Sequence, residues 1–132
     1  MIQKGISRHN SLAFYVENES EKKRGKRRMV LDYRTLNKNC EFDSYKIPDK
    51  NNLISFIENR KIFSKFDCKS GFWQIKMHPD SISWTSFSVP QGKYEWLVMP
   101  FGYKNAPQVF QLRIDGIFRK YSKFALYTLT MY

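Results

Sequence analysis

The residue of this sequence that is best placed to do chemistry is Asp67. It directly follows a short apolar run in residues 61–66, and Ser70 and Gly71 come shortly after it. The apolar run predicts a strand, so we expect a carboxylate at the mouth of a buried strand. A carboxylate in that position is usually paired with a cation or bound to a metal ion. An Asp that ends a strand can also cap a helix or form a turn, and these few residues alone leave both interpretations open.

A run of basic residues is the second feature with chemical potential. Six of the seven residues 22–28 are Lys or Arg, and the exception, Gly25, suggests a turn. A basic run is often only a solvated or disordered loop. Here a segment with an apolar centre, residues 29–34, follows at once, so we expect the charges to be held on a hairpin. The formal net charge of +11 favours a polyanionic partner, with nucleic acid as the first candidate and an anionic membrane as the second.

Size and composition are those of one globular domain. The chain has 132 residues, of which 42% are hydrophobic and 17% aromatic, enough to build a core. Cys40 and Cys68 are far apart in sequence and have no His at a ligand spacing, so we expect two reduced thiols. The first residues lack a signal-peptide pattern and no segment is apolar enough for a membrane span. These features predict an intracellular protein, cytoplasmic or nuclear and not secreted.

The elements that precede Asp67 are predicted from local patterns. We expect strands at residues 11–17 and 29–34, joined by the basic hairpin. Residues 35–50 are polar and predict an irregular segment. A helix is then expected to begin at Asp49 or Lys50, because apolar residues from 53 to 57 fall on one side of it. The strand at residues 61–66 would follow directly.

The elements that follow Asp67 include the clearest local signals. Residues 72–77 predict a short helix or turn that Pro79 closes. Residues 85–89 alternate in polarity, and a Pro-Gln-Gly turn separates them from a second strand at residues 94–99, which predicts a β-hairpin. Asn105 is expected to cap a long helix that ends near Lys120. A last strand is expected from Phe124 onward.

Three ordered motifs give the sequence a family resemblance. They are Phe-Asp-Cys-Lys-Ser-Gly-Phe-Trp-Gln at residues 66–74, Pro-Gln-Gly-Lys-Tyr-Glu-Trp at 90–96, and Met-Pro-Phe-Gly-Tyr-Lys-Asn-Ala-Pro at 99–107. The chain resembles the reverse transcriptases of plant pararetroviruses, the caulimovirus family, and of their gypsy-type retrotransposon relatives, from about Ser11 to Leu126. The resemblance implies an α+β fold: the fingers and first part of the palm of a right-hand polymerase, an antiparallel sheet with packed helices, truncated at the catalytic hairpin. Residues 1–132 would then be one partial reverse transcriptase domain.

The first motif carries most of the chemistry that this resemblance implies. Asp67 would be a catalytic carboxylate and a ligand of Mg²⁺, and the backbone carbonyl of Cys68 would be a further metal ligand. The backbone at Ser70 and Gly71 would approach a nucleoside triphosphate, since glycine permits close contact. Phe72 would be the steric gate that leaves no room for a ribose 2′-hydroxyl. The alternative for Phe72 is ordinary core packing.

Other positions would bind the nucleotide and the template. Arg28 and one of Lys22 or Lys23 would clamp the triphosphate, because Arg can bind phosphate oxygens bidentately. Phe101, Gly102 and Lys104 match the motif that lies against the incoming nucleotide and the template strand. The implied partners are an RNA or DNA template-primer and deoxynucleotides, without a membrane. Two positions need comment: Arg34 is expected to pair with a neighbouring carboxylate, and Tyr103 stands where the relatives generally have Leu.

One motif of the family is not found in this chain. Relatives carry Tyr-X-Asp-Asp soon after the long helix, but here Leu126 is followed by Tyr-Thr-Leu-Thr-Met-Tyr, and no carboxylate follows Asp115. These six residues can be encoded as TAT ACA TTG ACG ATG TAT, which spells Tyr-Ile-Asp-Asp-Val when read from the third base. We therefore expect a frameshift near Leu126 in a decayed, integrated pararetroviral or retrotransposon copy, and weak Mg²⁺ binding without polymerase activity. The other interpretations are a non-specific nucleic-acid-binding module and a fragment with no selected role.

Overall fold

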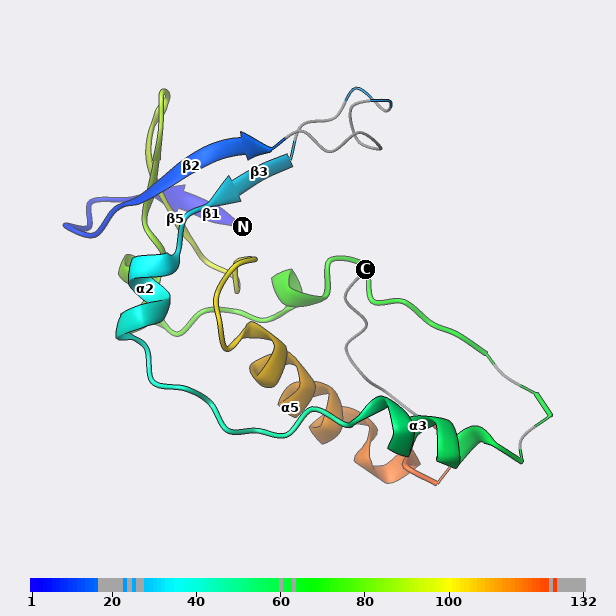
Figure 1. The fold of residues 1–132 in the computed structure, drawn as a ribbon. Helices are drawn as coiled ribbons and strands as arrows, with labels where there is room; N and C mark the ends of the chain where they lie inside the picture. Colours follow the sequence, from blue (N-terminus) through cyan, green and yellow to red (C-terminus); the bar gives the residue numbers. More distant parts are fainter. Residues whose placement is uncertain are drawn as a thin grey trace.

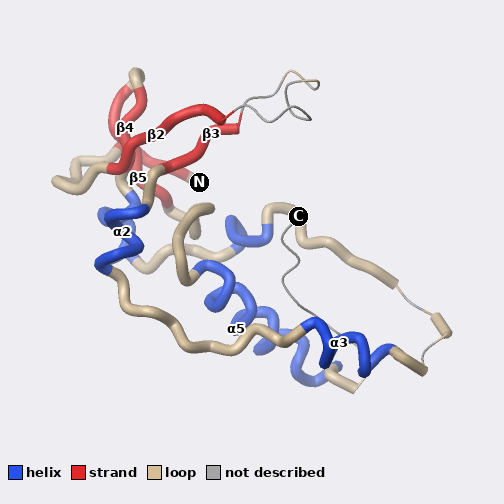
Figure 2. The backbone as a smooth tube through the Cα atoms, in the orientation of Figure 1, coloured by secondary structure: helices blue, strands red, loops and turns tan. Residues whose placement is uncertain are grey.

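The computed structural model of the protein describes residues 1–16, 23, 25, 28–59, 61, 62, 64–123 and 125. Its strands gather at one end of the molecule, and the longest helix runs away from them (Figures 1 and 2). The expected last strand from Phe124 onward falls outside these residues, and so does the turn of the basic hairpin apart from Lys23 and Gly25. Gly25 has a φ of 65°, which agrees with a turn at that position.

Five strands form one sheet in the order β1-β5-β4-β2-β3. The ladders β1–β5, β4–β5 and β2–β3 are antiparallel, but the ladder between β2 and β4 is parallel, so the sheet is mixed and not antiparallel throughout as expected. Together with the helices it confirms the expected α+β class. The strands are β1 (Ile2–Lys4), β2 (Ser11–Val16), β3 (Arg28–Leu31), β4 (Phe87–Val89) and β5 (Gly92–Trp96).

Two of the expected hairpins are present. β2 pairs with β3 from Ala13↔Leu31 to Val16↔Arg28, and β4 pairs with β5 around a tight turn that ends at Gly92, whose φ is 133°. Both were predictable because alternating polarity and a turn residue lie next to each other in sequence. β1 was not predicted. It pairs Ile2 with Trp96, so its partner lies far along the sequence.

The helices agree with the expectations in part. Those longer than one turn are α2 (Arg34–Asn39), α3 (Lys50–Ile57) and α5 (Ala106–Phe118), and the short ones are η1 (Gly71–Gln74), α4 (Pro79–Ile82), η2 (Ser83–Thr85) and η3 (Arg119–Tyr121). α3, η1 and α5 lie where the sequence predicted them. The prediction that residues 35–50 form an irregular segment was wrong, because α2 occupies the start of this segment. Leu36 of α2 is partly buried against the core. Pro79 begins α4 instead of closing an element, which suits a residue with fixed φ and no N–H to donate.

The described residues of the segment 61–66 do not form the expected strand, and this corrects the picture of Asp67 at a buried strand mouth. The described part of this segment is extended loop, and the side chains of Ile62 and Phe66 are 90% and 92% exposed. A strand needs a neighbour to accept its hydrogen bonds, and no ladder among the described residues includes this segment. The apolar side chains of Ile62 and Phe66 therefore contribute little to the core.

The core consists of two clusters that meet at Trp73. Tyr33, Phe87 and Trp96 are buried on the sheet, and Phe72, Met99 and Ala106 are buried between η1 and α5. The ring of Trp73 stacks on that of Trp96 with centroids 5.9 Å apart, while its chain neighbour Phe72 belongs to the second cluster. The two clusters are thus joined into one apolar interior.

Within the described ranges, no helix has the length and apolar character that crossing a membrane requires.

Candidate active site

The backbone turn after Asp67 is fixed by its own hydrogen bonds. Ser70 has φ 52° and ψ 48°, the left-handed conformation that non-glycine residues seldom adopt. The amide of Trp73 donates to the Ser70 carbonyl at 2.9 Å, and the Gln74 side chain donates to the Lys69 carbonyl at 2.9 Å. The turn therefore presents the backbone of residues 69–71 in one defined geometry.

Gly71 lies against the long helix at a distance that excludes a side chain. A Cβ added there would come within 2.9 Å of Cε2 and Cζ of Phe110, on α5. Real Cβ atoms are essentially never this close to a neighbouring carbon, so only glycine fits without a shift of the Phe110 ring. Gly71 thus sets how closely η1 approaches α5.

Phe72 is brought against the third motif. Its side chain is 8% exposed, and its ring centroid lies 5.3 Å from that of Phe101 and 5.7 Å from that of Phe110. Phe101 is 46% exposed, so the aromatic pair reaches from the core to the surface. The contact joins residues 66–74 to residues 99–107. Both interpretations of Phe72 stay open, because a packed ring can also be a steric gate.

The loop that contains Phe101, Gly102 and Lys104 is held by the Asn37 side chain of α2 and by the backbone carbonyl of Cys40 at the end of that helix. Gly102 has a φ of 90°, a conformation that favours glycine. The Asn37 amide donates to the Gly102 carbonyl at 2.8 Å and accepts from the backbone N–H of Lys104 at 2.9 Å. The ammonium of Lys104 donates to the carbonyl of Cys40, the residue that ends α2. A role of Lys104 in nucleic-acid binding stays a prediction.

Asn105 precedes α5, as expected, but its side chain does not cap that helix. Instead it donates to the Glu41 carbonyl at 2.7 Å and accepts from the backbone N–H of Asp43 at 3.2 Å. It therefore ties the start of α5 to the segment that follows α2.

Asp67 and Cys68 are exposed on the loop that leads into this turn. A carboxylate and a backbone carbonyl are the oxygen donors that Mg²⁺ prefers, but two such donors are too few for a dedicated octahedral site. In the described ranges no three His, Cys, Asp or Glu side chains come together in a group that could hold a metal. These residues fit only part of a coordination sphere.

Cys40 and Cys68 are both free thiols, as expected.

The structure leaves the expected triphosphate clamp untested. Lys22 lies outside the described residues, Lys23 is exposed in a turn, and the backbone of Arg28 begins β3 while its side chain lies outside the description.

Arg34 pairs with the neighbouring carboxylate of Asp32, as predicted. Its guanidinium donates to both carboxylate oxygens, at 2.9 Å and 2.7 Å, and its backbone N–H adds a third bond at 3.1 Å. These bonds, above all those from the Arg34 side chain, lower the pKa of Asp32 from 3.8 to about 2.

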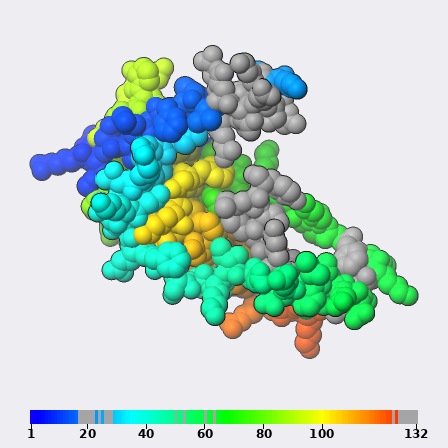
Figure 3. All heavy atoms as spheres, in the orientation of Figure 1, coloured from blue at the N-terminus to red at the C-terminus, as the bar shows by residue number. Residues whose placement is uncertain are grey.

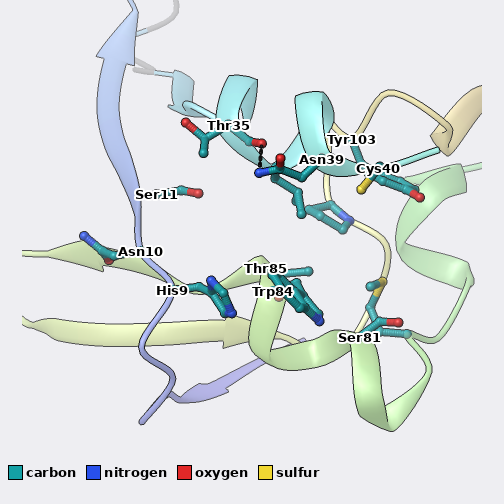
Figure 4. Close-up of a pocket in the computed structure, with 13 residues that line it drawn as sticks. His9, Asn10, Ser11, Thr35, Asn39, Cys40, Ser81, Trp84, Thr85 and Tyr103 are labelled. Atoms are coloured by element: carbon teal, nitrogen blue, oxygen red, sulfur yellow. Dashed lines mark hydrogen bonds between the residues drawn. The ribbon is translucent and has the colours of Figure 1, made fainter. Parts of the chain in front are cut away.

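Two hollows lie on opposite faces of α2. One, of about 430 Å³, is bordered by β2, β3, Asn37 and Gly102, and therefore adjoins the candidate site. The other, of about 320 Å³, is lined by Thr35, Leu36, Asn39 and Cys40 of the helix region and by Trp84 opposite, against which His9 stacks at 3.9 Å (Figure 4). None of the predicted site residues lines this second hollow, although Pro100 and Tyr103 of the third motif do.

Sequence reasoning missed Asn37, although it contacts the predicted loop twice. A single polar residue in a polar segment carries no pattern that would mark it, because its partners are backbone atoms 65 and 67 residues away.

Comparison with protein families gives a match over most of the chain. The family model described as reverse transcriptase (RNA-dependent DNA polymerase) matches residues 20–132. The match covers all three motifs on which the resemblance rests.

Viral polyproteins are similar to this chain in sequence. The enzymatic polyprotein of Cauliflower mosaic virus (strain Strasbourg) is 49% identical over 124 residues, and polyprotein P3 of Commelina yellow mottle virus is 47% identical over 131 residues. Each alignment covers 94% of this chain. The chain spans 18% of the length of the first relative and 7% of the second.

A solved structure shares the fold. The foamy viral protease-reverse transcriptase in complex with an RNA/DNA hybrid superposes with a TM-score of 0.74 at 22% sequence identity. The superposition covers 99% of this chain and 18% of that one. At this identity the likeness shows the fold alone.

Proposed function

The chain belongs to the reverse transcriptase (RNA-dependent DNA polymerase) family, and we propose that it forms the fingers and first part of the palm of such an enzyme from an integrated pararetrovirus or retrotransposon. The observation that carries the proposal is the contact between Phe72 and Phe101, at 5.3 Å between ring centroids. It brings together two motifs that the sequence separates and that the family uses at one nucleotide site.

The nucleotide would lie over this aromatic pair. The fixed backbone at Ser70 and Gly71 would face the triphosphate, and Phe72 would exclude a ribose 2′-hydroxyl by occupying its space. Arg28, with Lys22 or Lys23, would neutralise the phosphates from the fingers hairpin. Deoxynucleotides are therefore the expected substrate class.

The template-primer would follow the exposed side of Phe101 and Gly102. The complex of the foamy viral enzyme with an RNA/DNA hybrid supports this partner by analogy. The net charge of +11 supports it physically, because binding releases counterions from the phosphate backbone. We place this polymerase in the cytoplasm or nucleus, where its templates are.

The 132-residue polypeptide would bind but not polymerise. When bound between several carboxylates, two Mg²⁺ ions activate the primer 3′-hydroxyl and hold the triphosphate. Asp67 and the Cys68 carbonyl would be ligands of these ions, but this polypeptide has no carboxylate after Asp115 to complete the set. We therefore expect weak Mg²⁺ binding and no phosphoryl transfer from these residues alone.

Primer extension on an RNA template with Mg²⁺ tests the proposal. The comparison uses this polypeptide, a version extended in the frame that restores Tyr-Ile-Asp-Asp-Val, and Asp67→Asn in each. Only the extended version should elongate the primer, and Asp67→Asn should abolish that activity. Elongation by the 132-residue polypeptide would show that the second carboxylate pair is dispensable, and an inactive extended version would refute the assignment of the site.

A nucleic-acid-binding module without chemistry is the second candidate, because the excess of basic residues alone would support it. It predicts affinity that falls steeply with salt, little preference among sequences, and no elongation by either version. A decayed fragment without a role would differ from both, because it would show no cooperative unfolding transition.

A further inference from the structure

We infer that Asn37 is a positioning residue for the loop of residues 101–104, hereafter the motif loop, and that it sets how this loop meets the template strand. The inference rests on the proposed function, which puts the motif loop against the incoming nucleotide and the template.

The amide of Asn37 makes two hydrogen bonds to backbone atoms of the motif loop. Its Nδ2 donates to the Gly102 carbonyl at 2.8 Å, and its Oδ1 accepts from the Lys104 N–H at 2.9 Å. One planar group therefore spans the turn of the loop and fixes the carbonyl and the amide relative to each other.

The motif loop has little backbone support of its own. Outside helices and strands, the described backbone bonds of residues 101–104 are limited to the turn into α5, where Ala106 N–H donates to the Tyr103 carbonyl at 3.1 Å. Gly102 and Lys104 thus depend on a side chain for these contacts. Without the Asn37 side chain, water would bond to the Gly102 carbonyl and the Lys104 N–H. Water satisfies their hydrogen bonding but does not fix their position.

Gly102 also lies close to Tyr33, a residue that is firmly held. An added Cβ on Gly102 would lie 3.6 Å from Cδ2 of Tyr33, and Tyr33 is 2% exposed, with its hydroxyl bonded to the Thr85 carbonyl at 2.8 Å. Asn37 therefore holds Gly102 close to the buried side chain of Tyr33. Because Phe101 immediately precedes Gly102, the same bond controls how Phe101 lies on Phe72.

α2 contributes a second tether. The Lys104 ammonium donates to the carbonyl of Cys40 at the end of α2, so bonds from both Asn37 and the helix terminus reach the motif loop. In the space-filling view the segment that contains α2 borders residues near 100 (Figure 3). The helix and the motif loop are therefore expected to move as one unit.

Asn39 provides a matched control on the same helix. Its Nδ2 donates to the Thr35 carbonyl at 3.1 Å, within α2, and its side chain lines the hollow on the other face (Figure 4). Asn39→Ala therefore makes the same chemical change as Asn37→Ala without removing a hydrogen bond to the motif loop.

Two measurements on the 132-residue polypeptide test the inference, with Asn37→Ala, Asn37→Asp and Asn39→Ala as variants. The first is the hydrogen-exchange rate of the Lys104 amide by NMR. The second is the affinity for a DNA template-primer with a single-stranded template overhang, divided by the affinity for a blunt duplex of the same length. Charge effects on duplex binding largely cancel in this ratio.

Asn37→Ala should raise Lys104 exchange and lower the overhang preference, each by about 2- to 10-fold, the range that loss of one net hydrogen bond produces. Asn37→Asp keeps an acceptor for Lys104 but offers no donor to the Gly102 carbonyl, so exchange should stay slow while the overhang preference falls. Asn39→Ala should leave both unchanged.

Unchanged Lys104 exchange in Asn37→Ala overturns the inference at the level of geometry. Raised exchange with an unchanged overhang preference overturns it at the level of function, and shows that Asn37 only supports the fold. If the unsubstituted polypeptide has no overhang preference, the proposed template contact fails first, and the inference fails with it.

Discussion

The same substitution should have opposite effects on stability at two glycines of this chain. Gly71→Ala places a methyl group 2.9 Å from two ring carbons of Phe110, whereas Gly116→Ala, in the last turn of α5, meets no heavy atom within 4 Å apart from its own stretch of helix. Both changes remove the same backbone freedom from the unfolded chain. They therefore separate the cost of crowding from the benefit of lower unfolded-state entropy.

The magnitudes follow from these two environments. Crowding of a packed site by one methyl group costs about 1–3 kcal/mol, and the entropy gain returns about 0.4–1 kcal/mol, so Gly71→Ala should lower the free energy of unfolding by up to about 2.6 kcal/mol. Gly116→Ala should raise it by about 0.5–1 kcal/mol, because alanine also favours a helix interior.

Urea unfolding followed by circular dichroism measures both changes. A double variant, Gly71→Ala with Phe110→Leu, tests the mechanism, because a shorter side chain at position 110 should remove the clash. On that background Gly71→Ala should become neutral or stabilising. If Gly71→Ala alone raises the stability, the Phe110 ring moves at no cost, and the argument that Gly71 sets the spacing of η1 and α5 is refuted.

Two further predictions concern the polar groups around α2. Tyr33→Phe removes the only described donor to the buried Thr85 carbonyl and should cost about 1–2 kcal/mol in urea unfolding; an unchanged midpoint would mean that this bond adds no net stability. Because the hydrogen bonds from Arg34 lower the folded-state pKa of Asp32 to about 2, their stabilisation should be complete above about pH 4 and be lost as the pH falls towards 2. Acid unfolding of Asp32→Asn should lack this component, and identical acid profiles for the two proteins would contradict it.

Features that depend on residues close together in the chain were predictable from the sequence. The β4–β5 hairpin has alternating polarity on both sides of a Gly turn, and α5 has an apolar face after Asn105. The two motifs that meet at Phe72 and Phe101 were also recognisable, because their residue types and order are specific. In these cases a short stretch of sequence carries the whole signal.

Features that depend on distant partners were not predictable. α2 has a single apolar residue in its middle, Leu36. The intrinsic propensity of its residues does not favour a helix, but the packing of Leu36 against the core does. β1 is too short to be recognised without its partner β5. The segment at residues 61–66 shows the opposite error. Its side chain types favour a strand, but a strand also needs a neighbouring strand to pair with, and the described residues of this segment form none. Asn37 belongs to the same class, since its role lies entirely in backbone atoms of another segment.

The pairing of β1 with β5 also orders events during synthesis on the ribosome. β1 has no partner until the chain has been made through Trp96, which takes roughly 5–20 s at about 5–20 residues per second. The β2–β3 and β4–β5 hairpins close locally and can form as soon as their own residues emerge. β1 therefore docks last, on a sheet that is already assembled, and Lys4 gives this waiting edge segment a charge that discourages pairing with other nascent chains. Destabilising changes in β1 would then mainly speed the loss of the native state and leave the rate of its formation almost unchanged.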